Sequence, residues 1–199
     1  MTRLVLFLAA AFVLAGCATS NLPMAPSRAA VDDYKYVIGP GDGINIIVWR
    51  NPELSMSVPV RPDGKLTSPL IEDLVAIGKN PSDLAREIEK QLTKYIQDPV
   101  VTVIVTGFVG PFSEQIRIVG SATRPSALPY KQNMTVLDAM IAVGGITEYA
   151  SGNRAVLIRT ADASKQYTLR LKDLLRGGDV SANVDLRPGD VIIIPEGWF

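Results

Sequence analysis

The sequence predicts an α+β protein of two small domains, in which a mixed sheet with one amphipathic helix precedes a second α+β unit. Short β-branched runs alternate with turn residues, two segments combine helical spacing with an N-cap, and a Gly- and Pro-containing stretch separates the two groups. The expected order is a signal peptide at 1–16, a tether at 17–33, a first domain at 34–107, a linker at 108–112, a second domain at 113–196 and an aromatic tail at 197–199.

The first residues have the layout of a secretory signal peptide. One positive residue, Arg3, precedes an uncharged run over 4–14 that is too short for a membrane span of about 20 residues. We expect cleavage between Gly16 and Cys17. Cys17 is the only cysteine, and a lipidated Cys17 would leave no free thiol in an oxidising compartment, whereas the alternative is a chance cysteine within a leader.

Composition excludes several classes of function. The formal net charge is zero, so nothing attracts nucleic acid. The chain has no histidine, which excludes Ser-His and Cys-His nucleophiles and histidine metal sites, and a lone cysteine excludes disulfides and thiolate clusters. These exclusions leave carboxylates, lysine, tyrosine and serine as the possible reactive groups. We expect a protein that is not an enzyme and that has no metal and no cofactor.

The first domain is expected to begin after a stretch rich in Pro, Ser and Ala that lacks periodicity and is typical of a flexible tether. Strands over 34–38 and 44–49 flank the turn Gly39-Pro40-Gly41-Asp42. Pro40 suits the second position of a type II turn and Gly41 the third, which requires a positive φ.

A second turn at 61–64, containing Pro62, Asp63 and Gly64, predicts a hairpin between strands over 56–60 and 65–67. A helix follows, with Asn80 as its N-cap and apolar residues recurring at helical spacing. The β-branched run over 100–105 then predicts a strand.

In the second domain, strands are expected over 115–120, 155–159, 166–171 and 191–194. Thr135 and Asp138 form a capping box at the start of a helix that ends at Gly144. The last strand follows Pro188-Gly189-Asp190, which repeats the Pro-Gly-Asp of the first turn.

Asp42 and Asp190 suggest a catalytic or metal site, but a carboxylate directly after Pro-Gly more often accepts backbone hydrogen bonds within its own turn. The adjacent acids Glu72 and Asp73 do not suit a glycosidase, whose two carboxylates must face each other across about 5 to 10 Å.

Several motifs together resemble a known family. The following segments, in this order, resemble the polysaccharide export domain of bacterial outer-membrane polysaccharide exporters: 36–42, 48–49, 52–54, 60–64, 68–71 and 98–103. Segments 118–120, 135–139, 142–145 and 186–195 resemble the soluble-ligand-binding β-grasp module that follows it in that family. Leu14-Ala15-Gly16-Cys17 resembles the lipobox of bacterial lipoproteins, and Ala18 implies sorting to the outer membrane with the chain facing the periplasm.

This resemblance implies an oligomeric ring that encloses a periplasmic passage for capsular or exopolysaccharide and works with an inner-membrane chain-length regulator. The best-known members continue into an amphipathic C-terminal helix, whereas this shorter arrangement is similar to that of exosortase-associated systems. Such a protein either crosses the membrane itself or forms a collar for a separate outer-membrane β-barrel. The alternative is a non-conducting module, tethered to the outer membrane, that binds glycan or a partner protein.

Some side chains are candidates for contact with the polymer or with neighbours. Four arginines either line a passage and hydrogen-bond sugars or are solvated surface residues: Arg61, Arg117, Arg124 and Arg154. Trp49 suits the core or a subunit interface better than a sugar platform. Trp198 and Phe199 either contact a neighbour or the membrane interface or are disordered.

Overall fold

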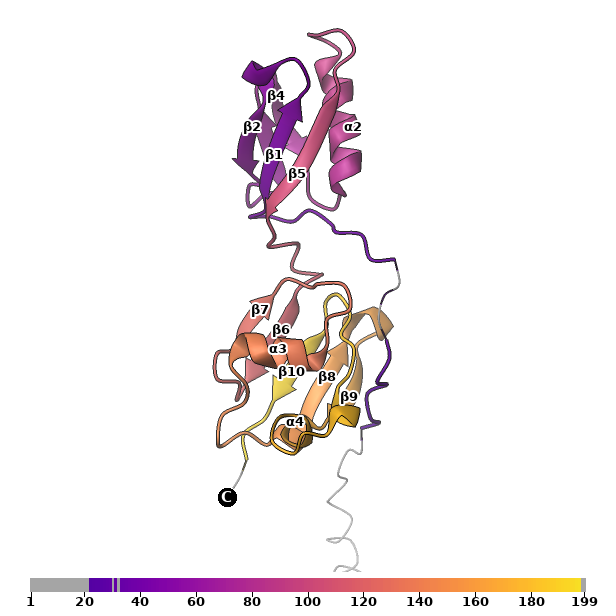
Figure 1. The fold of residues 1–199 in the computed structure, drawn as a ribbon, viewed down its shortest axis with the longest axis vertical. Coiled ribbons are helices and arrows are strands. Elements are labelled where there is room, and N and C mark those ends of the chain that lie inside the picture. The colour runs from indigo at the N-terminus through magenta and orange to yellow at the C-terminus, as the bar shows by residue number, and fades with distance from the viewer. Residues whose placement is uncertain (1–21, 30, 32, 198–199) are drawn as a thin grey trace, which may run out of the picture.

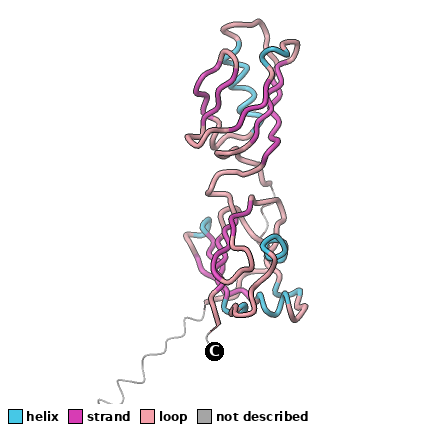
Figure 2. Tube along the Cα trace, turned by 90° about the vertical axis from the view of Figure 1, so that its left-hand side faces the viewer, coloured by secondary structure: helices cyan, strands magenta, loops and turns pink. Residues whose placement is uncertain are grey.

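The computed structural model describes residues 22–29, 31 and 33–197. Two units lie one above the other along the long axis of the molecule (Figure 1). A view from the side shows that they meet at a narrow waist formed by loops (Figure 2). Each unit has its own hydrophobic core, and the two cores share no residue.

The first unit contains two small antiparallel sheets and one long helix. Its three-stranded sheet has the order β2-β1-β5, and β3 pairs with β4 in a separate two-stranded sheet. The elements are β1 (Gly43–Val48), a 3-10 turn (Pro52–Leu54), β2 (Met56–Pro59), β3 (Lys65–Ser68), β4 (Ile71–Val75), α2 (Pro81–Leu92) and β5 (Val101–Gly107).

The helix α2 forms where capping and apolar spacing predict it. The Asn80 side chain accepts a hydrogen bond from the Asp83 N–H at 3.0 Å, and Pro81 occupies the first helical position. Leu84, Ile88 and Leu92 are buried against the sheets. The core of the first unit therefore lies between α2 and the inner faces of its strands.

The predicted hairpin around 61–64 is wrong in its pairing. The turn itself forms, since the Gly64 N–H donates to the Arg61 carbonyl at 2.8 Å. However, β2 pairs with β1, and β3 pairs with β4. Val60 accounts for this separation, because its N–H donates to the Asp42 carbonyl and its carbonyl accepts from the Gly41 N–H, so the end of β2 is bound to the first turn.

The second unit contains one mixed sheet of five strands in the order β7-β6-β10-β8-β9, in which only the β6–β10 pair is parallel. Its strands are β6 (Ile116–Gly120), β7 (Ser126–Leu128), β8 (Ala155–Arg159), β9 (Lys165–Leu169) and β10 (Val191–Ile194). Its helices are α3 (Val136–Val143) and α4 (Leu171–Leu175), with 3-10 turns at Gly152–Arg154, Thr160–Asp162 and Val180–Ala182.

The helix α3 begins with the capping box that the sequence predicts. Thr135 and Asp138 exchange side-chain and backbone hydrogen bonds, and Gly144 ends the helix with φ of 78°. Val136 and Met140 are buried against the sheet. The predicted strand over 166–171 is too long at its end, because Leu171 already begins α4 and buries its side chain in the core.

The N-terminal segment differs from the flexible tether that its composition predicts. The Thr168 N–H donates to the Pro23 carbonyl at 2.9 Å, and the Ala29 N–H donates to the Asp185 carboxylate at 3.0 Å. Residues 22–29 therefore lie along the second unit, beside the edge strand β9 (Figure 1). Composition does not reveal this, because an edge strand binds through backbone groups that every residue carries. The predicted signal peptide, Gly16 and Cys17 lie outside the described residues.

Within the part of the chain that the structure describes, no helix is both long enough and apolar enough to cross a bilayer.

Candidate functional site

The first Pro-Gly-Asp turn holds the connection between the two units. Asp42 is fully buried, and its Oδ2 accepts from the Gly39 N–H at 2.9 Å and from the Tyr36 hydroxyl at 2.6 Å. Its Oδ1 accepts from the N–H groups of Val109 and Gly110 at 2.7 and 2.8 Å. Because all of these donors serve one carboxylate, Asp42 satisfies backbone groups that would otherwise be buried without partners.

Glycines in both Pro-Gly-Asp turns touch the linker. A Cβ added at Gly39 would overlap the backbone of Gly110 and Pro111. A Cβ added at Gly189 would overlap the Ser113 carbonyl oxygen. The two turns thus contact opposite ends of the same short connection, one from each unit. The motif occurs twice in the sequence, but nothing in its spacing places both copies at the linker.

The second turn contains a buried ion pair that the sequence analysis missed. Asp190 is fully buried, its Oδ2 accepts from the Arg187 N–H at 2.9 Å, and the Arg159 Nε lies 3.7 Å from the same oxygen. Burial raises the pKa of Asp190 to about 6, which outweighs the opposing effects of the Arg187 N–H and of Arg159. Among the described residues, neither Asp190 Oδ1 nor Arg159 Nε has a hydrogen-bond partner.

Arg159 is 1 % exposed and donates to the Asp185 carbonyl at 2.7 Å. Its guanidinium also lies 5.7 Å from the centre of the Tyr167 ring. The alternation of buried and half-buried positions along β8 places Arg159 on the same face as Ala155 and Leu157. That period-2 pattern is the signal in the sequence that could have identified it.

Four aromatic rings surround the waist. Tyr36 and Phe108 meet edge to face with ring centres 5.3 Å apart, and Tyr34 and Tyr130 do so at 4.9 Å. Burial raises the pKa of the Tyr34 hydroxyl to about 12, and the pKa values of Tyr36 and Tyr130 are raised for the same primary reason. Tyr34 and Tyr36 precede the first turn, while Tyr130 belongs to the second unit, so this cluster connects the two.

A cavity of about 520 Å³ opens beside these rings. We call it the junction cavity; it is lined by Tyr36, Phe108, Pro129, Tyr130 and Lys131. Its lining comes from both units and from the linker. Aromatic and apolar side chains dominate this lining, and Lys131 is its one charged residue.

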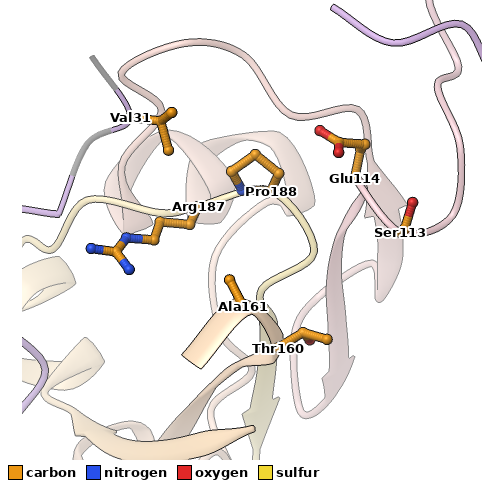
Figure 3. A pocket seen from close by; sticks show the side chains of 7 residues that line it. All are labelled: Val31, Ser113, Glu114, Thr160, Ala161, Arg187 and Pro188. Carbon is orange, nitrogen blue, oxygen red and sulfur yellow. The ribbon is translucent and has the colours of Figure 1, made fainter. Parts of the chain in front are cut away.

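A second cavity, of about 460 Å³, lies next to the Asp190 turn (Figure 3). Val31, Glu114 and Arg187 contribute to its lining. The polar groups here already have partners: Arg187 pairs with Asp162 at 3.2 Å and donates to the Ala29 carbonyl, and Glu114 hydrogen-bonds Tyr34. This cavity therefore offers a ligand fewer unpaired polar groups than the junction cavity does.

The four arginines that sequence analysis selected are not brought together. Arg61 lies in the first unit and pairs with Asp63 and Asp73, the latter at 2.7 Å. Arg154 lies in the second unit, where it donates to the Ser151 hydroxyl at 2.6 Å and to the Glu196 carbonyl at 3.3 Å. The exposed Arg117 lies on β6 and the exposed Arg124 on the loop that follows it.

Trp49 is 66 % exposed, so the interpretation that places it in the core is wrong. It follows β1, whose alternate residues point inward at Ile44, Ile46 and Val48, and the alternation leaves Trp49 on the outer face. Ile47, Val100 and Ile104 are exposed on this same face, because Trp49 pairs with Val100 and Ile47 with Thr102. We call these four residues the outer apolar face. Trp198 and Phe199 lie outside the described residues.

Across the described residues, no group of three or more Cys, Asp or Glu side chains is arranged to hold a metal ion. The neighbouring acids Glu72 and Asp73 are both exposed on the small β3–β4 sheet, and Asp73 is already paired with Arg61.

Comparison with known proteins identifies both units. Residues 30–106 match the family described as "Polysaccharide biosynthesis/export protein", and residues 114–194 match the SLBB domain. The two matches show a polysaccharide export domain followed by an SLBB domain. The Asp42 turn therefore lies in the export domain, the Asp190 turn lies in the SLBB domain, and the linker that both turns touch lies between the matched regions.

Curated relatives carry consistent names. The chain is 26% identical over 200 residues to "EPS I polysaccharide export outer membrane protein EpsA" of Ralstonia nicotianae, covering 88% of this chain and 51% of the relative. It is 27% identical to the protein of the same name from Ralstonia solanacearum, covering 79% and 47%. It is 26% identical to "Exopolysaccharide production protein ExoF" of Rhizobium meliloti, covering 85% and 42%. The chain thus spans about half the length of these relatives.

Proposed function

We propose that this protein is an outer-membrane lipoprotein that forms an oligomeric periplasmic channel or collar for the export of capsular or exopolysaccharide. The observation that carries the proposal is the succession of an export domain and an SLBB domain along almost all of the described chain. The names of the relatives support the outer membrane as the location.

The outer apolar face supports an oligomer. Trp49, Val100, Ile47 and Ile104 lie together on the solvent side of a three-stranded sheet and are between 40 % and 66 % exposed. Contiguous exposed apolar surface of this kind marks contacts with other proteins more often than free surface. In the proposed ring, this face of one subunit packs against its neighbour.

The remaining partners follow from the proposed role. The exported polysaccharide passes through the ring, an inner-membrane chain-length regulator supplies it, and a separate outer-membrane β-barrel is the partner if the ring acts as a collar. Lipid on Cys17 attaches the ring to the membrane, with the folded units in the periplasm. The zero net charge gives no attraction to nucleic acid.

Three experiments test this proposal. Deletion of the gene should abolish surface polysaccharide, and the wild-type gene should restore it. Electron microscopy of the detergent-extracted protein should show rings. A protein that stays monomeric at high concentration would instead favour the tethered glycan- or partner-binding module. Incubation of the purified protein with exopolysaccharide should release no sugar, because we propose transport without cleavage.

A further inference from the structure

The junction cavity has the composition of a sugar-binding site. Carbohydrate rings have an apolar face of C–H groups and a rim of hydroxyl groups, so proteins bind them with an aromatic wall and a few hydrogen-bonding groups. The cavity provides such a wall in Phe108, which is 58 % exposed although it contacts Tyr36 edge to face. Its volume of about 520 Å³ falls within the range of ordinary ligand pockets, which is about 300 to 1,000 Å³.

The cavity has one polar group that the protein leaves open to a ligand. The Tyr36 hydroxyl already donates to Asp42, and the Tyr130 side chain is only 4 % exposed, so neither of these hydroxyls is available. Lys131 is exposed and forms no ion pair within the described chain, so its ammonium group is free to donate hydrogen bonds.

The cavity is also formed in advance of binding. Phe108 directly precedes Val109 and Gly110, which donate to the buried Asp42 carboxylate. On the opposite wall, Tyr130 packs against Tyr34. A site whose walls are held in this way loses little conformational entropy when it binds a ligand.

We infer that the junction cavity binds one sugar ring of the exported polysaccharide, with the ring stacked on Phe108 and with the Lys131 ammonium donating hydrogen bonds to its oxygen atoms. This inference rests on the proposed export function, which supplies the polymer. It places a polymer contact between the two domains instead of at the arginines, which the structure leaves dispersed.

The test is calorimetric titration of the full-length, detergent-solubilised protein with short oligosaccharides prepared by mild acid hydrolysis of the strain's own exopolysaccharide. We expect Phe108→Ala to weaken binding about tenfold, since an aromatic contact of this kind is lost. Phe108→Tyr should retain binding, because it preserves the ring. Lys131→Met, at an exposed position where folding is not at risk, should also weaken binding.

Phe112 provides a matched control. It is 74 % exposed, belongs to the same linker and does not line the junction cavity, so Phe112→Ala should bind the oligosaccharides as the wild type does. Undiminished binding by both Phe108→Ala and Lys131→Met would overturn the inference, as would equal weakening by Phe112→Ala. The export proposal is judged separately by the deletion strain: if surface polysaccharide is lost there while the cavity variants bind normally, only the sugar site fails.

Discussion

Asp42 and Gly110 are joined by a hydrogen bond of 2.8 Å from the Gly110 N–H to the Asp42 Oδ1, although 68 positions separate them in the sequence. The neighbouring Val109 N–H donates to the same oxygen at 2.7 Å. The turn near the start of the export domain thereby binds the chain just after the last strand of that domain. The direction in which the linker leaves this domain consequently depends on one carboxylate.

Replacement of Asp42 by Ala should therefore destabilise the protein strongly. The change leaves the N–H groups of Gly39, Val109 and Gly110 without their acceptor, and we expect the free energy of unfolding to fall by about 3 to 5 kcal/mol. Urea unfolding followed by circular dichroism measures the loss. Glu53→Ala, at an exposed carboxylate, should stay within about 0.5 kcal/mol of the wild type. Equal stability of the Asp42 and Glu53 variants would contradict the proposed role of Asp42 in holding the linker.

Gly39→Ala tests how closely the linker approaches the first turn. The added methyl group would overlap the backbone of Gly110 and Pro111, which cannot rotate away as a side chain can, so the linker must move. We expect a change in the angle between the units, visible as altered small-angle X-ray scattering, together with a loss of stability of about 1 to 3 kcal/mol. Gly78→Ala meets no neighbouring atom and should leave the scattering curve unchanged.

Asp190 should make the stability depend on pH. Its pKa is raised by burial from the ordinary value of 3.8 to about 6, so the folded protein binds the proton more tightly than the unfolded chain does. The free energy of unfolding should therefore fall as the pH rises from about 4 to 6, by an amount of order 2 kcal/mol. Urea unfolding at several pH values across this range measures the slope.

The variant Asp190→Asn removes the titrating group. Its free energy of unfolding should therefore change little between about pH 4 and 6. Glu53→Gln, at an exposed carboxylate, should preserve the wild-type slope. If Asp190→Asn keeps the full slope, the pH dependence comes from another group. At low pH Asp190 is protonated in the folded wild type as well, so the variant and the wild type should have similar stabilities there.

Trp49→Ser should weaken assembly without unfolding the subunit, because the side chain is largely exposed and lies on the outer apolar face. Analytical ultracentrifugation in detergent should show a shift from rings toward monomers at an unchanged melting temperature. Tyr95, which is 58 % exposed beyond the end of α2, gives the control Tyr95→Ser, for which we expect intact rings. Rings of normal size and stability in Trp49→Ser would remove this face from the proposed interface.

Cys17→Ser should release the protein from the membrane, since we propose that acyl chains on this residue attach it. Fractionation of cells should recover the variant in the soluble periplasmic fraction, and surface polysaccharide should decrease. Acyl burial contributes about 0.8 kcal/mol per methylene group, so the loss of several chains cannot be replaced by weak surface contacts. Normal export by a fully soluble variant would refute the anchoring role.

The sequence predicts much of the fold because local signals and tertiary packing agree there. Asn80 with Pro81 predicts the start of α2, Thr135 with Asp138 that of α3, and the isoleucine run after Asp190 predicts β10. The pairing of the strands is harder to predict from the sequence. The 61–64 turn suggests a local hairpin, yet the backbone of Val60 binds the first turn, which lies far from it in the sequence.

The candidate site could be predicted only in part. The Pro-Gly-Asp motif indicates carboxylates that accept backbone hydrogen bonds, but the donors from Val109 and Gly110 are visible only once the chain has folded. The junction cavity combines Tyr36, Phe108 and Tyr130, which no sequence spacing connects. For Trp49 the sequence leaves both the core and a subunit interface open, because an aromatic residue after a buried strand suits either, and its exposure on the outer side of β1 excludes the core.

The hydrogen bond between Thr168 and Pro23 sets a limit on how far the protein can stand from a membrane. A free tether from Cys17 to Asp33 could extend about 55 Å, whereas the five residues from Cys17 to Leu22 can extend only about 18 Å. If acyl chains occupy Cys17, the SLBB domain is held close to the lipid headgroups. In the periplasmic orientation that we propose, the export domain would then project toward the inner membrane, where a growing polymer would first meet it.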